Sequence, residues 1–206
     1  MREAPAGVVS AKVLIPHLQS LARERVDTLL NRIWGYRVGL VVAPAGSGKS
    51  TLLAGFASAQ KVPVAWYRAE SWDAKTTTML NHLESAFAAA LGPLPGNWDS
   101  VETAARGLES WPGRRALLVI DDLHALEDSP AERTLERLID YAPPSITFLI
   151  GSRALPLKSS LSWLAERKAG RPACNYFISR LRENPPSNGV AFSAGSAAAR
   201  SSPGNI

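Results

Sequence analysis

The stretch Val41–Leu53, VVAPAGSGKSTLL, places a lysine and two hydroxyl residues behind a run of small residues. Gly46 and Gly48 would let backbone N–H groups converge on one point without obstruction by side chains. The apolar residues on either side predict a buried strand and then a helix, whose N-terminal end would face the same point. This arrangement favours the binding of an anion, and a phosphate group in particular.

Lys49 would reach the β- and γ-phosphates of a nucleotide, and the Ser50 hydroxyl would help to hold Mg²⁺. The stretch departs from the pattern G-x-x-x-x-G-K-[ST] only at Ala43, which replaces the first glycine and is tolerable there if its φ is negative. The alternative interpretation is an ordinary glycine-rich turn with a solvated lysine. We predict that the phosphate-binding residues are Ala45, Gly46, Ser47, Gly48, Lys49, Ser50 and Thr51.

Acidic and basic residues end two further apolar segments. In LLVIDDLH, Asp121 would bind Mg²⁺, and Asp122 would orient or deprotonate the attacking water. The alternative is a strand that ends in a turn with helix-capping acids. In FLIGSR, Arg153 would sense the γ-phosphate or stabilise charge on it, unless it is a solvated loop arginine. His124 would report the nucleotide state, or it is a partly buried structural histidine.

The hydrophobic pattern alternates between strands and helices. Short apolar runs predict strands within 37–43, 62–69, 115–124 and 145–153. Helical spacing predicts helices within 18–33, 50–58, 130–139 and 161–168, with two more that begin at Asp73 and at Asp99 or Ser100. This order predicts an α/β fold, a P-loop NTPase with a parallel sheet and helices on both faces.

The composition of the chain indicates how many domains it forms, its cellular compartment and whether it binds membranes or DNA. The chain of 206 residues is long enough for one ordinary domain, and its single cysteine, Cys174, fits a reducing compartment. Without an apolar run of membrane-spanning length or a secretory leader, we expect a cytoplasmic protein that does not bind membranes. The formal charge of +5 is concentrated after Gly170, where four Arg accompany one Glu. We therefore expect no direct DNA binding by this chain.

The last segment breaks the pattern. After Gly170 the periodicity stops, and apart from a marginal apolar patch at 176–181 the sequence is rich in Pro, Gly, Ser and Ala. Such a composition does not offset the entropy of ordering. The predicted organisation is an N-terminal extension (1–17), a P-loop ATPase domain (18–170) and a mostly disordered tail (171–206).

From about Lys12 to Gly170 the chain resembles the N-terminal ATPase domain of MalT-like regulators, which are signal-transducing (STAND) P-loop ATPases of the LuxR-type family. The resemblance rests on the order of VVAPAGSGKSTLL, VAWYRAESWDAK, LLVIDDLHAL and ITFLIGSRALPL, and alanine at position 43 is expected in that family. It implies that 45–51 bind phosphates, Asp121 binds Mg²⁺, Asp122 supports hydrolysis and Arg153 senses the γ-phosphate. Arg23 matches an arginine that precedes the P-loop in such proteins.

The resemblance implies a module that binds and slowly hydrolyses ATP as a switch and that self-associates in its ATP form. The sensor and DNA-binding regions of such regulators have no counterpart in this sequence. We hypothesise a truncation or a reading-frame shift near Gly170, which would leave the sheet without its last strand. The alternatives are an ATP-dependent enzyme such as a small-molecule kinase, an interaction domain without turnover, and a non-functional fragment.

Overall fold

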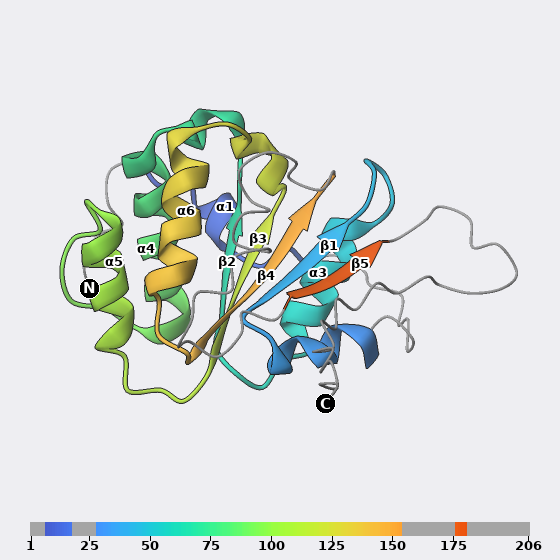
Figure 1. The fold of residues 1–206 in the computed structure, drawn as a ribbon, viewed down its shortest axis with the longest axis horizontal. Coiled ribbons are helices and arrows are strands. Elements are labelled where there is room, and N and C mark those ends of the chain that lie inside the picture. The colour runs from blue at the N-terminus through green and yellow to red at the C-terminus, as the bar shows by residue number, and fades with distance from the viewer. Residues whose placement is uncertain (1–6, 18–27, 154–175, 181–206) are drawn as a thin grey trace, which may run out of the picture.

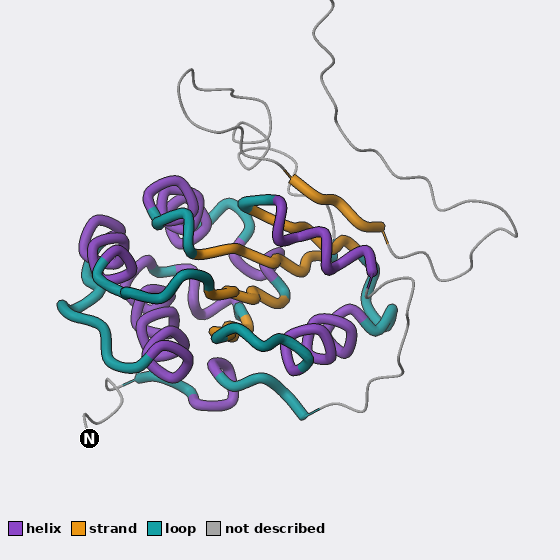
Figure 2. Tube along the Cα trace, turned by 90° about the horizontal axis from the view of Figure 1, so that it is seen from below, coloured by secondary structure: helices purple, strands orange, loops and turns teal. Residues whose placement is uncertain are grey.

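The computed structural model describes residues 7–17, 28–153 and 176–180 of the chain. These residues form a parallel sheet of five strands in the order β2-β3-β4-β1-β5, with helices on both sides (Figures 1 and 2). The elements in chain order are α1 Ser10–Val13, η1 Asn31–Gly35, β1 Val38–Val42, α3 Lys49–Ser58, β2 Val64–Arg68, η2 Ser71–Ala74, α4 Thr76–Leu91, α5 Val101–Glu109, β3 Ala116–Asp121, η3 Leu123–Leu126, α6 Pro130–Tyr141, β4 Ile146–Ser152 and β5 Tyr176–Arg180.

Each central strand supplies side chains to two hydrophobic clusters, one on each face of the sheet. In β3, Leu118 and Ile120 join the cluster under α4, α5 and α6, whereas Leu117 and Val119 join the cluster under α3. Successive strand residues point to opposite faces, so a strand covered on both faces is apolar throughout. This explains why short uninterrupted apolar runs predicted the strands, and it confirms the predicted α/β fold with helices on both faces.

The helix boundaries follow local capping. Ser100 caps α5 and exchanges hydrogen bonds with Thr103, while Ser129 accepts a hydrogen bond from the Glu132 amide at the start of α6. The helix start predicted at Asp73 is wrong, because α4 begins at Thr76. Asp73 instead lies in η2, where its carboxylate accepts a hydrogen bond from the Glu70 amide.

The sequence-based expectation that the sheet lacks its last strand is also wrong. Residues Tyr176–Arg180 form β5, which pairs in parallel with β1 from Val38↔Tyr176 to Val42↔Arg180. The run YFISR is aromatic and β-branched, and β1 offers it an edge of backbone groups that need partners. The composition of the whole segment 171–206 concealed this short strand.

Other predictions lie partly or wholly outside the described residues. The predicted helix at 161–168 lies wholly outside them, as does most of the predicted helix at 18–33. The division into 1–17, 18–170 and 171–206 stays a prediction. In the part of the chain that the structure describes, no helix combines the length and the apolar character needed to span a bilayer.

Candidate functional site

The loop between β1 and α3 has the backbone that its sequence predicts. Gly46 and Gly48 have φ angles of +79° and +77°, a region that side-chain-bearing residues rarely enter. Ala43 is not among the described residues with positive φ, so alanine fits the position where the motif has glycine. The Ala43 amide donates to the Ser152 carbonyl of β4, at 3.1 Å, and fixes the start of the loop. The loop ends at Lys49, the first residue of α3.

The Lys49 ammonium lies between two carboxylates. Its Nζ is 3.3 Å from Asp121 Oδ1 and 3.0 Å from Asp122 Oδ1. Lys49 is only 6% exposed and Asp121 only 1%, so their contact is shielded from water, whereas the Asp122 side chain is 27% exposed. The lysine that would bind phosphate is therefore held by the two acids that would serve the metal and the attacking water.

The two acids end β3 in a tight turn. Asp122 has a left-handed backbone with φ of 58°, and its amide donates to the carboxylate of Asp121 at 3.0 Å. Its carbonyl accepts from the Ala125 amide, which starts η3. Aspartate is among the few residues that tolerate this left-handed backbone region. The chain therefore turns away from the direction of β3 at Asp122.

Two more of the predicted residues lie at the same edge. His124 Nδ1 is 3.8 Å from Asp122 Oδ1. Burial and the nearby Arg153 cation lower the pKa of His124 below its ordinary 6.5, against the opposing charge of Asp122. Arg153 itself follows β4 and is exposed. The structure thus brings Asp121, Asp122, His124 and Arg153 together at the carboxyl ends of β3 and β4, where parallel sheets bind ligands.

Gly151 is a site residue that the sequence analysis missed. A Cβ atom placed on it would lie 2.6 Å from Leu53 Cδ1, 3.0 Å from Asp121 Oδ1 and 3.3 Å from Lys49 Cδ. Its missing side chain therefore leaves room for the lysine and the carboxylate to meet above β4. The signal that could have revealed it is a glycine inside an otherwise apolar strand, which marks a close approach of other groups to the backbone.

The donors present suit Mg²⁺ held together with a nucleotide. Among the described residues, no group of three or more His, Cys, Asp or Glu side chains could hold a metal ion by itself. Mg²⁺ in nucleotide sites takes one or two protein oxygens and completes its shell with phosphate oxygens and water. The carboxylate of Asp121 and the hydroxyl of Ser50, the residue after Lys49, are such donors. The predicted roles of all these residues, namely phosphate binding by 45–51, Mg²⁺ binding by Ser50 and Asp121, and catalysis by Asp122 and Arg153, stay predictions. Arg23 lies outside the described residues.

Comparison with known proteins identifies the family of the chain and supports its fold. The sequence model of the family described as "AAA domain" matches residues 34–155, more than half of the chain and all of the site described above. The chain belongs to this AAA domain family. Solved structures agree on the fold of this AAA domain: a Walker-type ATPase of Pyrococcus abyssi superposes with a TM-score of 0.56 at 14% identity, over 81% of this chain and 57% of that one. A chain of Drosophila ORC bound to DNA gives 0.50 at 16% identity, over 78% and 89% of the two chains.

The curated proteins that this AAA domain is similar to include transcriptional regulators. It is 29% identical over 164 residues to the HTH-type transcriptional regulator MalT of Cronobacter sakazakii, which covers 72% of this chain and 17% of that protein. The MalT of Yersinia pestis is 27% identical over 153 residues, which is 66% of this chain and 16% of that protein. The chain is thus a MalT-like ATPase domain, and it spans about a sixth of the length of these relatives.

Proposed function

We propose that the chain is the ATP-binding and ATP-hydrolysing switch module of a MalT-like transcriptional regulator. The observation that carries the proposal is the contact of Lys49 with Asp121 and Asp122 at the carboxyl edge of the sheet. The cation proposed to bind phosphate already lies within 3.3 Å of each of the two acids proposed to serve hydrolysis. Family membership and the similarity to MalT support the same function.

The side chains divide the work as follows. Lys49 exchanges its carboxylate partners for the β- and γ-phosphates of ATP, while the amides at the start of α3 bind phosphate oxygens. Asp121 and Ser50 would hold Mg²⁺, which would offset phosphate charge when bound. Once Lys49 has moved to the phosphates, Asp122 is able to accept a proton from the attacking water. Arg153 contributes positive charge near the γ-phosphate.

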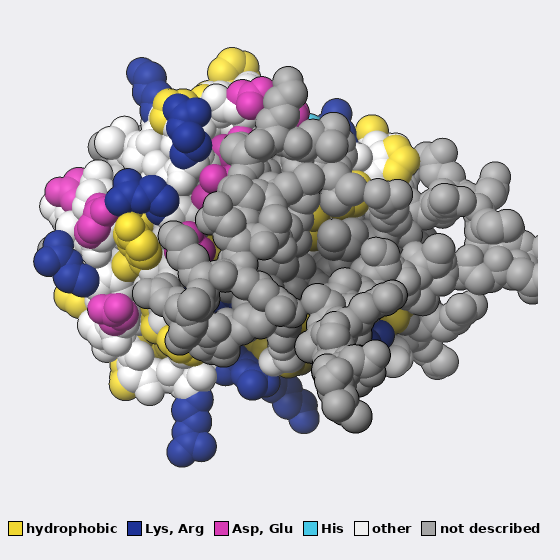
Figure 3. All heavy atoms as spheres, in the orientation of Figure 1, with side chains coloured by type: hydrophobic (Ala, Val, Ile, Leu, Met, Phe, Trp, Pro, Cys, Tyr) yellow, Lys and Arg dark blue, Asp and Glu magenta, His cyan; other side chains and the backbone are white. Residues whose placement is uncertain are grey.

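The partners of the module follow from this role. ATP is the ligand, and its binding and slow hydrolysis change the state of a cytoplasmic regulator that self-associates in the ATP form. The DNA contacts of such a regulator belong to other domains. In support, on the left of the face seen in Figure 3 the Lys and Arg side chains of the described residues lie among Asp and Glu side chains.

A thermal-melt titration of the chain with Mg-ATP tests the proposal, with Lys49→Met beside the wild type. Methionine keeps the buried stem of the lysine and removes its charge. Binding to the native state alone should stabilise the wild type by about 2.7 kcal/mol at one hundred times Kd. Lys61→Met, at an exposed lysine, is the matched control and should respond as the wild type does. A wild type that does not respond to Mg-ATP would refute the proposed function.

A further inference from the structure

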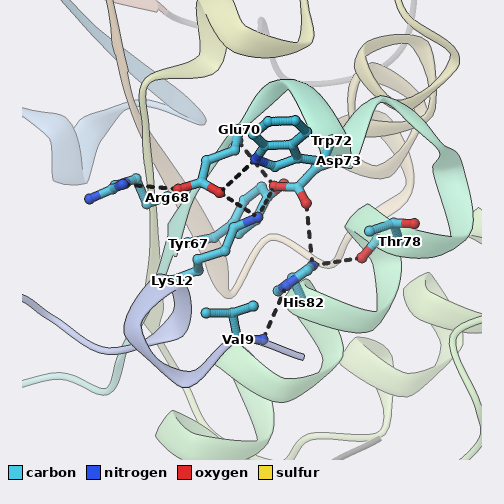
Figure 4. Close-up of polar contacts among 9 residues, drawn as sticks. All are labelled: Val9, Lys12, Tyr67, Arg68, Glu70, Trp72, Asp73, Thr78 and His82. Carbon is cyan, nitrogen blue, oxygen red and sulfur yellow. Dashed lines mark hydrogen bonds and ion pairs between the residues drawn. The ribbon is translucent and has the colours of Figure 1, made fainter. Parts of the chain in front are cut away.

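A second group of charged side chains lies one strand away from the candidate site, at the end of β2 (Figure 4). Lys12 of α1 forms an ion pair with Asp73 of η2 and lies 3.5 Å from Glu70. Lys12 is 5% exposed and Asp73 is 1% exposed. A pair so well shielded from water holds its two segments strongly, because losing either partner leaves an uncompensated buried charge.

Asp73 is the centre of this cluster. Its Oδ2 accepts hydrogen bonds from Lys12 Nζ, from the Tyr67 hydroxyl at 2.9 Å and from the Glu70 amide at 3.0 Å. Burial and the charge of Asp73 raise the pKa of Tyr67, so its hydroxyl stays protonated and donates. Lys12 is the only one of these donors that comes from the N-terminal segment 7–17.

The N-terminal segment has a second attachment. His82 of α4 has Nδ1 2.8 Å from the Thr78 carbonyl, to which it donates, and its Nε2 accepts from the Val9 amide at 3.4 Å. α1 packs on both β2 and α4. Two attachments, at Val9 and at Lys12, therefore fix α1 over the end of β2.

Backbone contacts connect this cluster with the acids of the candidate site. Arg68, the last residue of β2, lies opposite Asp121 in the parallel register. The next residue, Ala69, donates its amide to the Asp121 carbonyl at 2.9 Å. Further along, η2 packs against η3, the turn that follows Asp122. Between Lys12 and the carboxylates there is a continuous series of bonded or packed groups.

We propose that Lys12 is a positioning residue for the nucleotide site: by holding Asp73 and η2 it fixes the end of β3, and with it Asp121 and Asp122. The consequence for catalysis rests on the proposed function, but the consequence for the backbone does not. The phosphate-binding loop does not depend on Lys12, because it is anchored to β4 through Ala43 and Ser152. We therefore expect Lys12 to affect the positions of Asp121 and Asp122, which would bind Mg²⁺ and water, and not the backbone of the phosphate-binding loop.

Backbone amide exchange measured by NMR tests the structural part without any nucleotide. In Lys12→Met, the amides of Ala69 and Asp122, which bond to Asp121, should exchange faster by about tenfold or more, because η2 opens more often. The amides of Ala43 and Leu52, which bond to Ser152 and Gly48, should keep their wild-type rates. Arg137→Met, which breaks an exposed ion pair with Glu102, is the matched control and should change none of the four.

Kinetics test the catalytic part. Lys12→Met should lower kcat roughly 10- to 100-fold, the cost of a small displacement of catalytic groups, and leave the affinity for ATP without Mg²⁺ within about twofold. A loss of melting temperature with unchanged exchange at Ala69 and Asp122 and unchanged kcat would overturn the proposal. If Lys12→Met fails to fold, Lys12→Met with Asp73→Asn removes both buried charges, and the same amides should still exchange faster. A wild type without ATP binding would refute the proposed function alone, since the exchange result stands by itself.

Discussion

Lys49 Nζ lies 3.0 Å from Asp122 Oδ1, although the two side chains serve opposite ends of the proposed reaction. In the proposed reaction the lysine would bind the phosphates, and the aspartate would bind the water that attacks them. Because phosphate and carboxylate are both anions that compete for the same ammonium group, ATP must displace Asp122 from Lys49. Binding of ATP would thereby release the acid that hydrolysis requires.

Asp122→Asn should bind ATP more tightly in the absence of Mg²⁺ and hydrolyse it more slowly. An ion pair of about 1 kcal/mol that no longer competes corresponds to a gain of roughly fivefold in affinity. The amide lacks the proton affinity to serve as a base, so turnover should fall by about 10². Asparagine tolerates the left-handed backbone of this position.

Isothermal titration without Mg²⁺ and a phosphate-release assay measure the two effects. Asp128→Asn is the matched control, since Asp128 also has positive φ, at 59°, and is exposed. Equal affinities in the Asp122→Asn variant and the wild type would contradict the competition between phosphate and carboxylate.

Gly151→Ala should disturb the contact between Lys49 and Asp121 without preventing the protein from folding. The added Cβ would lie 2.6 Å from Leu53 Cδ1, 3.0 Å from Asp121 Oδ1 and 3.3 Å from Lys49 Cδ, so Leu53 must shift and the carboxylate and the lysine must also give way slightly. We expect a loss of about 1–3 kcal/mol in the free energy of unfolding, typical of overpacking, together with weaker ATP binding. Denaturant unfolding and titration measure both quantities.

Gly35→Ala is the corresponding control, because a Cβ at Gly35 would meet nothing within 4 Å. If Gly151→Ala bound ATP as tightly as the wild type, the space left by Gly151 would not be required for Lys49 and Asp121 to bind ATP.

His124 should make the stability of the protein depend on pH. Burial and the Arg153 cation lower the pKa of His124 in the folded state below its ordinary 6.5, so the unfolded chain takes up the proton first. Stability from this residue is fully present above pH 6.5 and is lost as the pH falls from there to the lowered pKa of the folded state. His124→Gln should remove this part of the pH dependence of the free energy of unfolding.

Urea unfolding of the wild type and His124→Gln at a series of pH values gives the difference directly. His17→Gln, at an exposed histidine, serves for comparison. A difference that grows towards higher pH instead would reverse the sign and contradict the assignment.

Arg37 should contribute to the free energy of unfolding by donating hydrogen bonds to backbone carbonyl groups at and after the end of α6. Its guanidinium donates to the carbonyls of Ile139, Ala142, Pro143 and Ile146. Arg37→Met should lower the free energy of unfolding by about 2–4 kcal/mol, since it removes several charge-assisted hydrogen bonds. Arg114→Met, at an exposed arginine, should have little effect in the same denaturant experiment.

The sequence predicted those parts of the fold that depend on local pattern. Four strands, the capped start of α5 and the glycine backbone of the phosphate loop each follow from a few neighbouring residues. It also selected Asp121, Asp122 and Arg153 as candidate site residues, and the structure places all three at one edge, because the carboxyl ends of parallel strands are on the same side.

The sequence did not predict contacts between distant residues. Lys12 and Asp73 are 61 positions apart, and nothing near Asp73 distinguishes a buried anion from the helix cap that we expected. The contact of Lys49 with both acids and the space above Gly151 depend on side-chain packing across three elements. β5 was missed because pairing with β1, and not the composition of its own surroundings, stabilises it.

The pairing of β5 with β1 also has a consequence for the order of folding. β1, which leads into the phosphate loop, lies between β4 and β5, so its two neighbours come from much later in the chain. During synthesis β1 leaves the ribosome long before either partner, and its backbone groups have no strand to pair with until then. Contacts so distant in sequence form slowly, because a long loop must close first. The strand that begins the proposed nucleotide site therefore gains its two neighbours only after β4 and β5 have been synthesised, and a nascent chain would acquire its affinity for ATP only after that point.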